Sequence, residues 1–221
     1  KKGEVFLIAE IGWNFLGDIQ LAEKMVKSAK DSGADAVKFQ VWDPQYLKSG
    51  SWDSDGRKEI YEKAFLDVNK FKKLCDFSNK LKIKCFTSVF TLRDLKKIAT
   101  VSNKIIKIPS HEAYNIELID EALKLFDQVI ISAGCLKKIE LDKLNKYIDN
   151  DKIIILHCVS SYPAVINQSN VYTIVDLYKK FGLNIGLSDH TLSNSVSCTS
   201  IAFGACLIEK HFTIDKDTNS P

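Results

Sequence analysis

The sequence predicts a single α/β domain built as a (β/α)8 barrel, or TIM barrel. Short β-branched runs alternate with amphipathic stretches of roughly ten to fourteen residues along the 221-residue chain. Such alternation is typical of a parallel sheet with helical crossovers, and eight strands are enough to close that sheet into a barrel. An open doubly wound sheet is the alternative. It is disfavoured because no G-x-G-x-x-G turn precedes the first helical stretch.

The predicted strands are short, and their first halves are apolar and rich in β-branched residues. They cover residues 5–10, 36–40, 84–88, 104–108, 129–132, 152–158, 184–188 and 206–211. Helical periodicity lies between them, for example in LAEKMVKSAKDSG (21–33), NKFKKLCDFSNKL (69–81) and IELIDEALKLF (116–126). No helical stretch follows the last strand, so we expect most of a barrel without its last helix.

The connection over residues 41–69 is unusually long for a loop between a strand and a helix. Loops of this length are often functional lids over a binding site. The alternative is a tolerated insertion that carries one small helix.

Composition and charge are those of an ordinary globular protein. Hydrophobic residues make up 45% and charged residues 27% of the chain. The formal net charge is +3 and the lysines are scattered among acids, which gives no case for a nucleic-acid partner. No run of apolar residues is long enough to predict a membrane span. The six cysteines form no C-x-x-C pair, which predicts free thiols in a reducing cytosol.

Polar and ionisable residues collect at the carboxyl ends of nearly all the predicted strands. Strand residues alternate between the barrel interior and the helices. In AVKFQV the apolar residues Val37 and Phe39 suit the helices, so Lys38 and Gln40 should point inward. The same parity places Glu10 at the end of an inward face. Barrel enzymes carry their chemistry at this end of the strands, which makes it the expected active site.

Two lysines and five serines at this end predict a site for a phosphate or carboxylate, because ammonium and hydroxyl groups can surround an anion. They are Lys38, Lys107, Ser88, Ser110, Ser132, Ser160 and Ser188. The alternative is an internal ion-pair lattice that seals the mouth of the barrel.

His190 and His211 end neighbouring strands, about 4.8 Å apart, so two imidazoles could reach one divalent ion. Waters and substrate oxygens would complete its ligand shell, which leaves the ion open for Lewis-acid chemistry. The alternative is a pair of polar caps at the rim of a core. His111 and His157 also lie near strand ends, but neither has an evident companion, so a structural role is favoured for each. Asp189 falls on the opposite face by strand parity and is not expected to be a ligand.

With these residues in view, the chain resembles the sialic acid synthase family, which includes the legionaminic and pseudaminic acid synthases. The motifs appear in order along nearly the whole chain: IAEIGWNFLGD, GADAVKFQ, FTSVF, KIPSHEA, ISAGC, HCVSSYP, GLSDHT and LIEKHFTID. The family uses a (β/α)8 barrel and condenses phosphoenolpyruvate with an N-acylated aminosugar such as N-acetylmannosamine and with water. The products are a nonulosonic acid and phosphate.

The resemblance implies a role for each candidate residue. His190 and His211 match the residues that hold a divalent metal, usually Mn²⁺, with Mg²⁺ or Co²⁺ as alternatives. The phosphoenolpyruvate pocket is implied for Ser88, Lys107, Ser110, Ser132 and Ser188, and Ser160 stands where many members have asparagine. The surroundings of the aminosugar and the reacting carbons are implied for Glu10, Lys38, Gln40, Glu112 and Tyr162, with Glu10, Lys38 and Glu112 as the catalytic candidates.

Two departures from the family pattern bear on function. Phe15 stands where many members have histidine, so any contact made by that imidazole is lost. Family members continue with an aspartate-bearing loop, a last helix and an antifreeze-like domain that supplies an arginine to the partner subunit of a homodimer. We therefore expect residues 1–221 to be a truncated catalytic domain of a cytoplasmic homodimer, with little or no activity by itself.

Two other functions remain open on the sequence. One is a barrel aldolase or lyase that forms a Schiff base on Lys38 or Lys107. The other is a non-catalytic member that binds sugar or phosphate, which Phe15 and the absent tail would favour.

Overall fold

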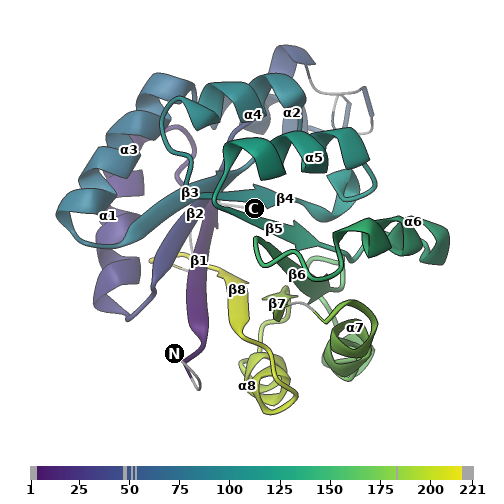
Figure 1. The fold of residues 1–221 in the computed structure, drawn as a ribbon. Coiled ribbons are helices and arrows are strands. Elements are labelled where there is room, and N and C mark those ends of the chain that lie inside the picture. The colour runs from purple at the N-terminus through teal and green to yellow at the C-terminus, as the bar shows by residue number, and fades with distance from the viewer. Residues whose placement is uncertain (1–3, 47–48, 51, 53, 183, 216–221) are drawn as a thin grey trace.

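A closed barrel of eight parallel strands forms the centre of the molecule (Figure 1). The structure, a computed structural model, describes residues 4–46, 49–50, 52, 54–182 and 184–215. The strands lie in chain order: β1 (Phe6–Gly12), β2 (Ala36–Gln40), β3 (Lys84–Ser88), β4 (Ile105–Ile108), β5 (Gln128–Ser132), β6 (Ile153–Cys158), β7 (Asn184–Asp189) and β8 (Leu207–His211). β1 pairs with both β2 and β8, which closes the barrel and confirms the predicted fold class.

Helices surround the barrel and form its outer layer (Figure 1). They are α1 (Ile19–Asp31), α2 (Arg57–Lys63), α3 (Val68–Lys80), α4 (Leu92–Ala99), α5 (Ile116–Leu125), α6 (Lys138–Lys143), α7 (Thr173–Phe181) and α8 (Ser195–Ala202). Aspartate caps begin two of them, since Asp18 and Asp67 accept hydrogen bonds from the first backbone N–H groups of α1 and α3. Among the described residues no helix follows β8, as the sequence predicts.

The long connection between β2 and α3 contains the short helix α2 and a 3-10 turn, η1 (Pro44–Tyr46). The small helix agrees with the alternative considered for this segment, an insertion that carries one small helix. The segment also supplies four aromatic side chains to one cavity at the mouth of the barrel. The segment is therefore more than a tolerated insertion, because its side chains form one wall of that cavity.

Two apolar layers hold the fold together, as strand parity predicts. The outer layer lies between strands and helices and includes Val37, Phe39 and Val41 from β2 and its end. The inner layer fills the barrel and includes Ile8, Phe86 and other inward-facing residues. These are the amino-terminal halves of the inward faces, so the inner layer is an apolar floor beneath the carboxyl ends of the strands.

Phe15 belongs to the outer apolar layer. Its side chain is fully buried and its ring meets that of Phe39 edge to face, with the centroids 5.8 Å apart. From the sequence, any contact made by an imidazole at this position was expected to be lost. The structure instead places the side chain of residue 15 in the core beside an aromatic neighbour, where a phenyl ring is the better occupant because it needs no hydrogen-bond partner.

No helix in the described part of the chain is long and apolar enough to cross a membrane. The six cysteines are all free thiols, as predicted, and they are spread over buried and exposed positions.

Candidate active site

Four buried charged side chains lie directly above the apolar floor of the barrel. They are Glu10 on β1, Lys38 on β2, Lys107 on β4 and Glu209 on β8, and each is at most 4% exposed. They point into the barrel from the inward faces of their strands. Glu10 and Glu209 each follow a residue of the apolar floor, Ile8 and Leu207, by two positions on the same face. We call these four residues the charge layer.

The charge layer consists of two lysines and two carboxylates that pair with one another. Lys38 Nζ lies 2.8 Å from Glu10 Oε2, and Lys107 Nζ lies 3.0 Å from Glu209 Oε1. A longer contact of 3.7 Å from Lys38 Nζ to Glu209 Oε2 joins the two pairs. The ion-pair lattice considered from the sequence is therefore present. The layer carries two positive and two negative groups, so it is balanced when all four are ionised.

The ionisation of the charge layer follows from burial and pairing together. Burial raises the pKa of Glu10, although Lys38 opposes the shift. Burial alone would lower the pKa of Lys38, but the adjoining carboxylates outweigh it and the pKa is raised. For Lys107, burial lowers the pKa more than the negative charge of Glu209 raises it, so the pKa is lowered. Burial would raise the pKa of Glu209, but the two lysines prevail and hold it at about 2, so Glu209 is ionised at neutral pH.

Serine hydroxyls lie next to the charge layer on several strands. Lys38 Nζ donates to Ser88 Oγ at 2.8 Å, and Ser188 Oγ donates to Glu209 Oε1 at 2.9 Å. Ser132 is buried, and among the described residues its hydroxyl has no hydrogen-bond partner. A buried hydroxyl without a partner is costly, so Ser132 is suited to bind a ligand at this point.

Ser110 and Ser160 lie close to the buried thiol of Cys158 at the end of β6. Ser110 Oγ is 2.9 Å from Cys158 Sγ, and Ser160 Oγ is 3.9 Å from it and accepts from Cys135 Sγ at 3.3 Å. All five serines predicted from the sequence therefore lie at or just after the carboxyl ends of strands, at the same end of the barrel.

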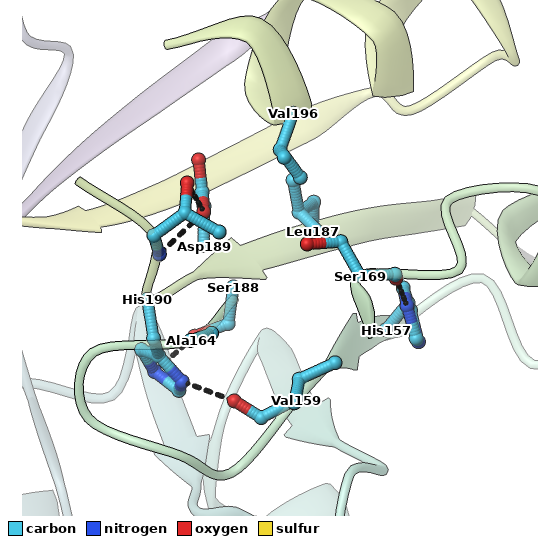
Figure 2. Close-up of a pocket in the computed structure, with 10 residues that line it drawn as sticks. His157, Val159, Ala164, Ser169, Leu187, Ser188, Asp189, His190 and Val196 are labelled. Carbon is cyan, nitrogen blue, oxygen red and sulfur yellow. Dashed lines mark hydrogen bonds between the residues drawn. The ribbon is translucent and has the colours of Figure 1, made fainter. Parts of the chain in front are cut away.

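His190 and His211 face each other at the mouth, with ring centroids 5.6 Å apart. His190 Nδ1 lies 2.7 Å from the carbonyl oxygen of Val159, which can only accept, so Nδ1 carries the proton (Figure 2). Nε2 then presents a lone pair. Tyr162 packs over both imidazoles, at 4.2 Å from the ring of His190 and 5.7 Å from that of His211.

The histidine pair suits a divalent cation. Ser188 lies 3.3 Å from His190 Nε2, but its single hydroxyl proton goes to ionised Glu209, so the lone pair of Nε2 remains available. Burial lowers the pKa of His190. Restricted hydration and the Lys38 charge lower the pKa of His211 to about 4, so both rings are neutral at pH 7, the form that binds metals. No cluster of three or more ligand side chains occurs among the described residues, so water and substrate would supply the other ligands.

The two remaining histidines contact other groups, and His111 lines the same cavity as Gln40 and Glu112. His157 Nε2 lies 2.7 Å from the carbonyl oxygen of Ser169, as Figure 2 shows. His111 stacks on Phe90, with ring centroids 5.2 Å apart, at the edge of the mouth. Neither ring joins the pair formed by His190 and His211.

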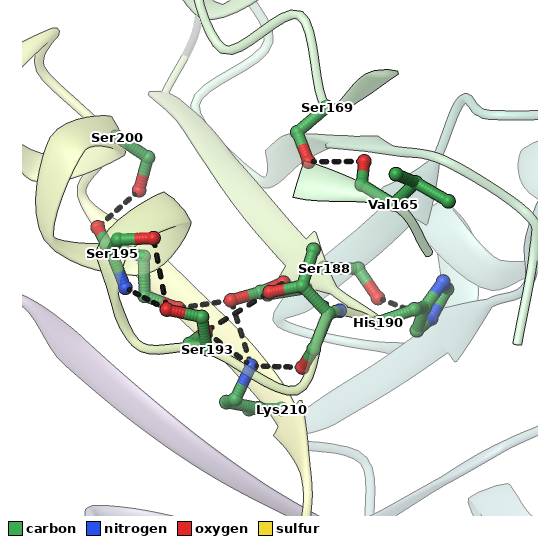
Figure 3. Close-up of polar contacts among 11 residues, drawn as sticks. Val165, Ser169, Ser188, His190, Ser193, Ser195, Ser200 and Lys210 are labelled. Atoms are coloured by element: carbon green, nitrogen blue, oxygen red, sulfur yellow. Dashed lines mark hydrogen bonds and ion pairs between the residues drawn. The ribbon is translucent and has the colours of Figure 1, made fainter. Parts of the chain in front are cut away.

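Asp189 points away from the mouth, as strand parity predicts, and binds β7 to α8 and β8. Its Oδ1 accepts from the backbone N–H of Thr191 at 2.9 Å, and its Oδ2 accepts from Ser197 and from Lys210 Nζ, the latter at 2.8 Å. Lys210 also donates to the carbonyl oxygens of Thr191 and Ser193 (Figure 3). This network holds the loop that carries His190.

Replacing Asp189 with asparagine is expected to lower the free energy of unfolding by about 2 kcal/mol, because a charged hydrogen-bond acceptor is lost from a buried network. Urea denaturation measures the effect. The control Asp142→Asn removes an exposed ion pair with Lys180 and should leave the free energy of unfolding nearly unchanged, because exposed ion pairs are screened by solvent. Unchanged stability with lost activity would instead make Asp189 a site residue.

Gln40 and Glu112 belong to the opposite side of the mouth. Gln40 Nε2 donates to Glu10 Oε1 at 2.6 Å, which ties it to the charge layer. Gln40 and buried Glu112 both line a cavity of about 410 Å³ whose other walls are mainly aromatic. Every candidate site residue named from the sequence therefore lies at the carboxyl ends of the strands.

Glu209 belongs to the charge layer but was not among the site residues predicted from the sequence. Parity places it on the same inward face as His211, and that was the one available signal. Its importance comes from contacts with Lys107, 102 positions away in the chain, and with Lys38 and Ser188. Nothing in the sequence near Glu209 indicates these partners.

The fold and this mouth together define a (β/α)8-barrel enzyme with its site at the carboxyl ends of the strands. The chain belongs to the NeuB family, the family of sialic-acid-type synthases, whose family model matches residues 25–221. The resemblance seen in the sequence motifs is thereby confirmed.

Named relatives agree with this assignment. The chain is 34% identical to the N,N'-diacetyllegionaminic acid synthase of Campylobacter jejuni, over 99% of this chain and 70% of that protein. It is 31% identical to the pseudaminic acid synthase of Helicobacter pylori, over 97% of this chain and 67% of that protein. The crystal structure of the N-acetylneuraminic acid (sialic acid) synthetase of Leptospira borgpetersenii superposes with a TM-score of 0.87 at 31% identity, covering 96% of this chain and 74% of that one.

Proposed function

We propose that this chain is the catalytic barrel of a synthase that joins phosphoenolpyruvate to an N-acylated aminosugar. In the reaction, the methylene carbon of phosphoenolpyruvate bonds to the aldehyde carbon of the open-chain sugar. Water adds to the middle carbon of the former enolpyruvyl unit, the bond from that carbon to the phosphate oxygen breaks, and phosphate leaves. The products are a nonulosonic acid and phosphate. The single observation that carries the proposal is the charge layer facing a neutral histidine pair within one barrel mouth.

We assign each group of site residues the role that suits its chemistry. Lys38 and Lys107 bind the anionic groups of phosphoenolpyruvate, and neighbouring hydroxyls such as that of Ser132 donate to its oxygens. A divalent cation held by His190 and His211, proposed as Mn²⁺ with Mg²⁺ or Co²⁺ as alternatives, would supply Lewis-acid polarisation of the aldehyde.

Two carboxyl groups are available for proton transfer and for holding sugar hydroxyls, Glu10 in the charge layer and Glu112 in the cavity wall. Tyr162, packed over the histidine pair, would close this side of the site against water.

The protein is further proposed to act as a homodimer in the cytoplasm, without nucleic-acid or membrane partners. The family resemblance supports the dimer. The near-balanced charge supports the absence of a nucleic-acid partner, and the free thiols support a cytoplasmic location. Light scattering of the full-length protein measures the subunit number.

Phosphate release tests the proposed reaction. The full-length protein is incubated with phosphoenolpyruvate, Mn²⁺ and a panel of N-acylated aminosugars, and sugar-dependent release of phosphate is expected. Ligand binding without turnover on any sugar would favour the non-catalytic alternative.

A Schiff-base aldolase is the second candidate, and one observation favours it: burial lowers the pKa of Lys107, as Schiff-base lysines require. Glu209 opposes this by holding the ammonium form at 3.0 Å. Borohydride reduction in the presence of pyruvate separates the two functions, since a covalent adduct on Lys107 or Lys38 would contradict the synthase.

Replacing Lys107 with methionine is expected to weaken phosphoenolpyruvate binding by about 10- to 100-fold, because one charged donor to the anion is lost while the buried aliphatic volume is kept. Titration calorimetry measures the Kd. Lys96→Met, at an exposed lysine on α4, is the control and should leave the Kd unchanged. An unaltered affinity in Lys107→Met would remove this lysine from the anion pocket.

A further inference from the structure

Two cysteine thiols converge on one hydroxyl group at the mouth of the barrel, after β5 and at the end of β6. Cys135 Sγ donates to Ser160 Oγ at 3.3 Å, and Cys158 Sγ lies 3.9 Å from the same oxygen, so the two sulfurs are at most about 7.2 Å apart. Cys158 Sγ also lies 2.9 Å from Ser110 Oγ. The thiol pair therefore adjoins two of the five serines predicted to bind an anion.

The pairing of β5 with β6 explains why the two thiols are close. Just after β5, the backbone N–H of Ala133 donates to the carbonyl oxygen of Leu156 on β6 at 2.9 Å. A side-chain carbon at Gly134 would lie 2.4 Å from Cys158 Sγ, so only glycine lets the backbone pass this close to the thiol. Cys135 is the next residue and lies in a turn. Movement of this turn can close the remaining separation between the sulfurs while both strands keep their places.

The two thiols differ in exposure, and this difference gives each a separate role. Cys135 is exposed, whereas Cys158 is buried, with 4% of its surface accessible. A small oxidant in solution therefore reaches Cys135 more readily than Cys158. An accessible thiol that is oxidised first, next to a second thiol that can attack it, is the arrangement found in redox-sensing cysteine pairs.

We propose that Cys135 and Cys158 form a reversible disulfide in the presence of hydrogen peroxide, and that this bond closes the anion pocket. One peroxide oxygen bonds to Cys135 Sγ as the O–O bond breaks, which gives a sulfenic acid and one water. Cys158 Sγ then bonds to Cys135 Sγ, the S–O bond breaks, and the hydroxyl group leaves with the thiol proton of Cys158 as a second water. A small dithiol reverses the step and is itself oxidised to a disulfide. Transient, redox-sensing disulfides of this kind are the ones expected in a reducing cytosol.

The disulfide would disturb the pocket because the sulfurs now hold its hydroxyl groups. A disulfide brings two sulfurs to about 2.05 Å, so Ser160 Oγ can no longer accept from Cys135. The same movement draws Cys158 Sγ away from Ser110 Oγ. Both hydroxyls then leave the positions that suit an anion, and the turn after Ser132 shifts with Cys135. The inference rests on the proposed function only for the identity of the anion, phosphoenolpyruvate.

Peptide mass analysis and titration calorimetry test the two halves of the proposal. The full-length protein is treated with hydrogen peroxide, its remaining thiols are alkylated, and the protein is digested. Peptides joined through Cys135 and Cys158 are expected, and dithiothreitol should separate them. The Kd for phosphoenolpyruvate should rise by at least about tenfold on oxidation, as the loss of one hydrogen bond to an anion implies, and should recover with dithiothreitol.

Cys135→Ser keeps a hydrogen-bond donor beside Ser160 but cannot form the disulfide. Its Kd for phosphoenolpyruvate should stay within about twofold of that of the unaltered, reduced protein, before and after peroxide. The matched control is Cys198→Ser, which removes an exposed thiol on α8 and should respond to peroxide as the unaltered protein does.

Three results would overturn the proposal: no joined peptides after peroxide, an unchanged Kd in the cross-linked protein, or an equal loss of affinity in Cys135→Ser. None of these would contradict the synthase reaction. A reduced protein that binds no phosphoenolpyruvate would instead overturn the proposed function, and joined peptides would still establish the disulfide between Cys135 and Cys158.

Discussion

Replacing Glu209 with glutamine is expected to lower the free energy of unfolding by about 3–5 kcal/mol and to abolish synthase activity. Glu209 is the carboxylate partner of buried Lys107 and also lies 3.7 Å from Lys38. Its loss leaves two buried ammonium groups with one carboxylate, and an uncompensated buried charge is strongly destabilising. Urea denaturation and phosphate release measure the two effects.

The control for this change is Glu121→Gln on α5. Glu121 pairs with Lys96 and Lys124, whose side chains are well exposed, so its replacement should cost less than about 1 kcal/mol. A stable and active Glu209→Gln protein would show that the charge layer does not depend on this carboxylate.

Replacing His211 with alanine is expected to lower kcat by at least about a hundredfold and to leave the fold intact. His211 is the last residue of β8 and lies at the rim of the mouth outside the apolar core, so its removal opens no core cavity. Lewis-acid polarisation of a carbonyl contributes several kcal/mol to transition-state stabilisation, and losing a ligand of the cation removes much of it. Mn²⁺ binding, followed by calorimetry, should weaken in parallel with activity.

His157→Ala is the matched control, because His157 also lies in a strand end but bonds to the carbonyl of Ser169 instead of facing His211. It should retain Mn²⁺ affinity. Metal-independent activity in His211→Ala would make the metal role of the pair wrong.

Much of the fold could be predicted because local pattern and global architecture agree in this chain. The AVKFQ run of β2 shows why: Val37 and Phe39 pack under the helices, and Lys38 points inward, as period-two parity requires. Strand boundaries shift by only one or two residues, since β1 ends at Gly12 and not at Glu10. Barrel closure follows from strand number, which the sequence also shows.

The candidate site could be predicted as a set of positions but not as a set of partners. Parity brings Glu10, Lys38 and Lys107 to one mouth. It does not say that Lys38 bonds to Ser88 while Lys107 turns to Glu209, because those contacts span the barrel interior between strands that are distant in the chain. The orientation of His190 depends on the carbonyl of Val159 in another loop, which no strand pattern encodes.

The aromatic cavity escaped prediction for a different reason. Trp13, Trp42 and Trp52 are well separated in the chain, and two of them lie in an irregular segment with no periodicity to orient its side chains. The length of that segment was the only sign of a function.

The segment between β2 and α3 is held at both ends by the barrel. Val41 N donates to the carbonyl oxygen of Ser88, and Asp67 caps α3. Between these anchors the chain places Trp42, Tyr46, Trp52 and Tyr61 around the cavity without contributing to the charge layer or the histidine pair. The rest of the cavity wall comes from other parts of the chain, including Gln40, Phe90 and Glu112. We therefore expect sequence changes within the segment to alter the shape of the cavity while the charge layer and the histidine pair keep their positions.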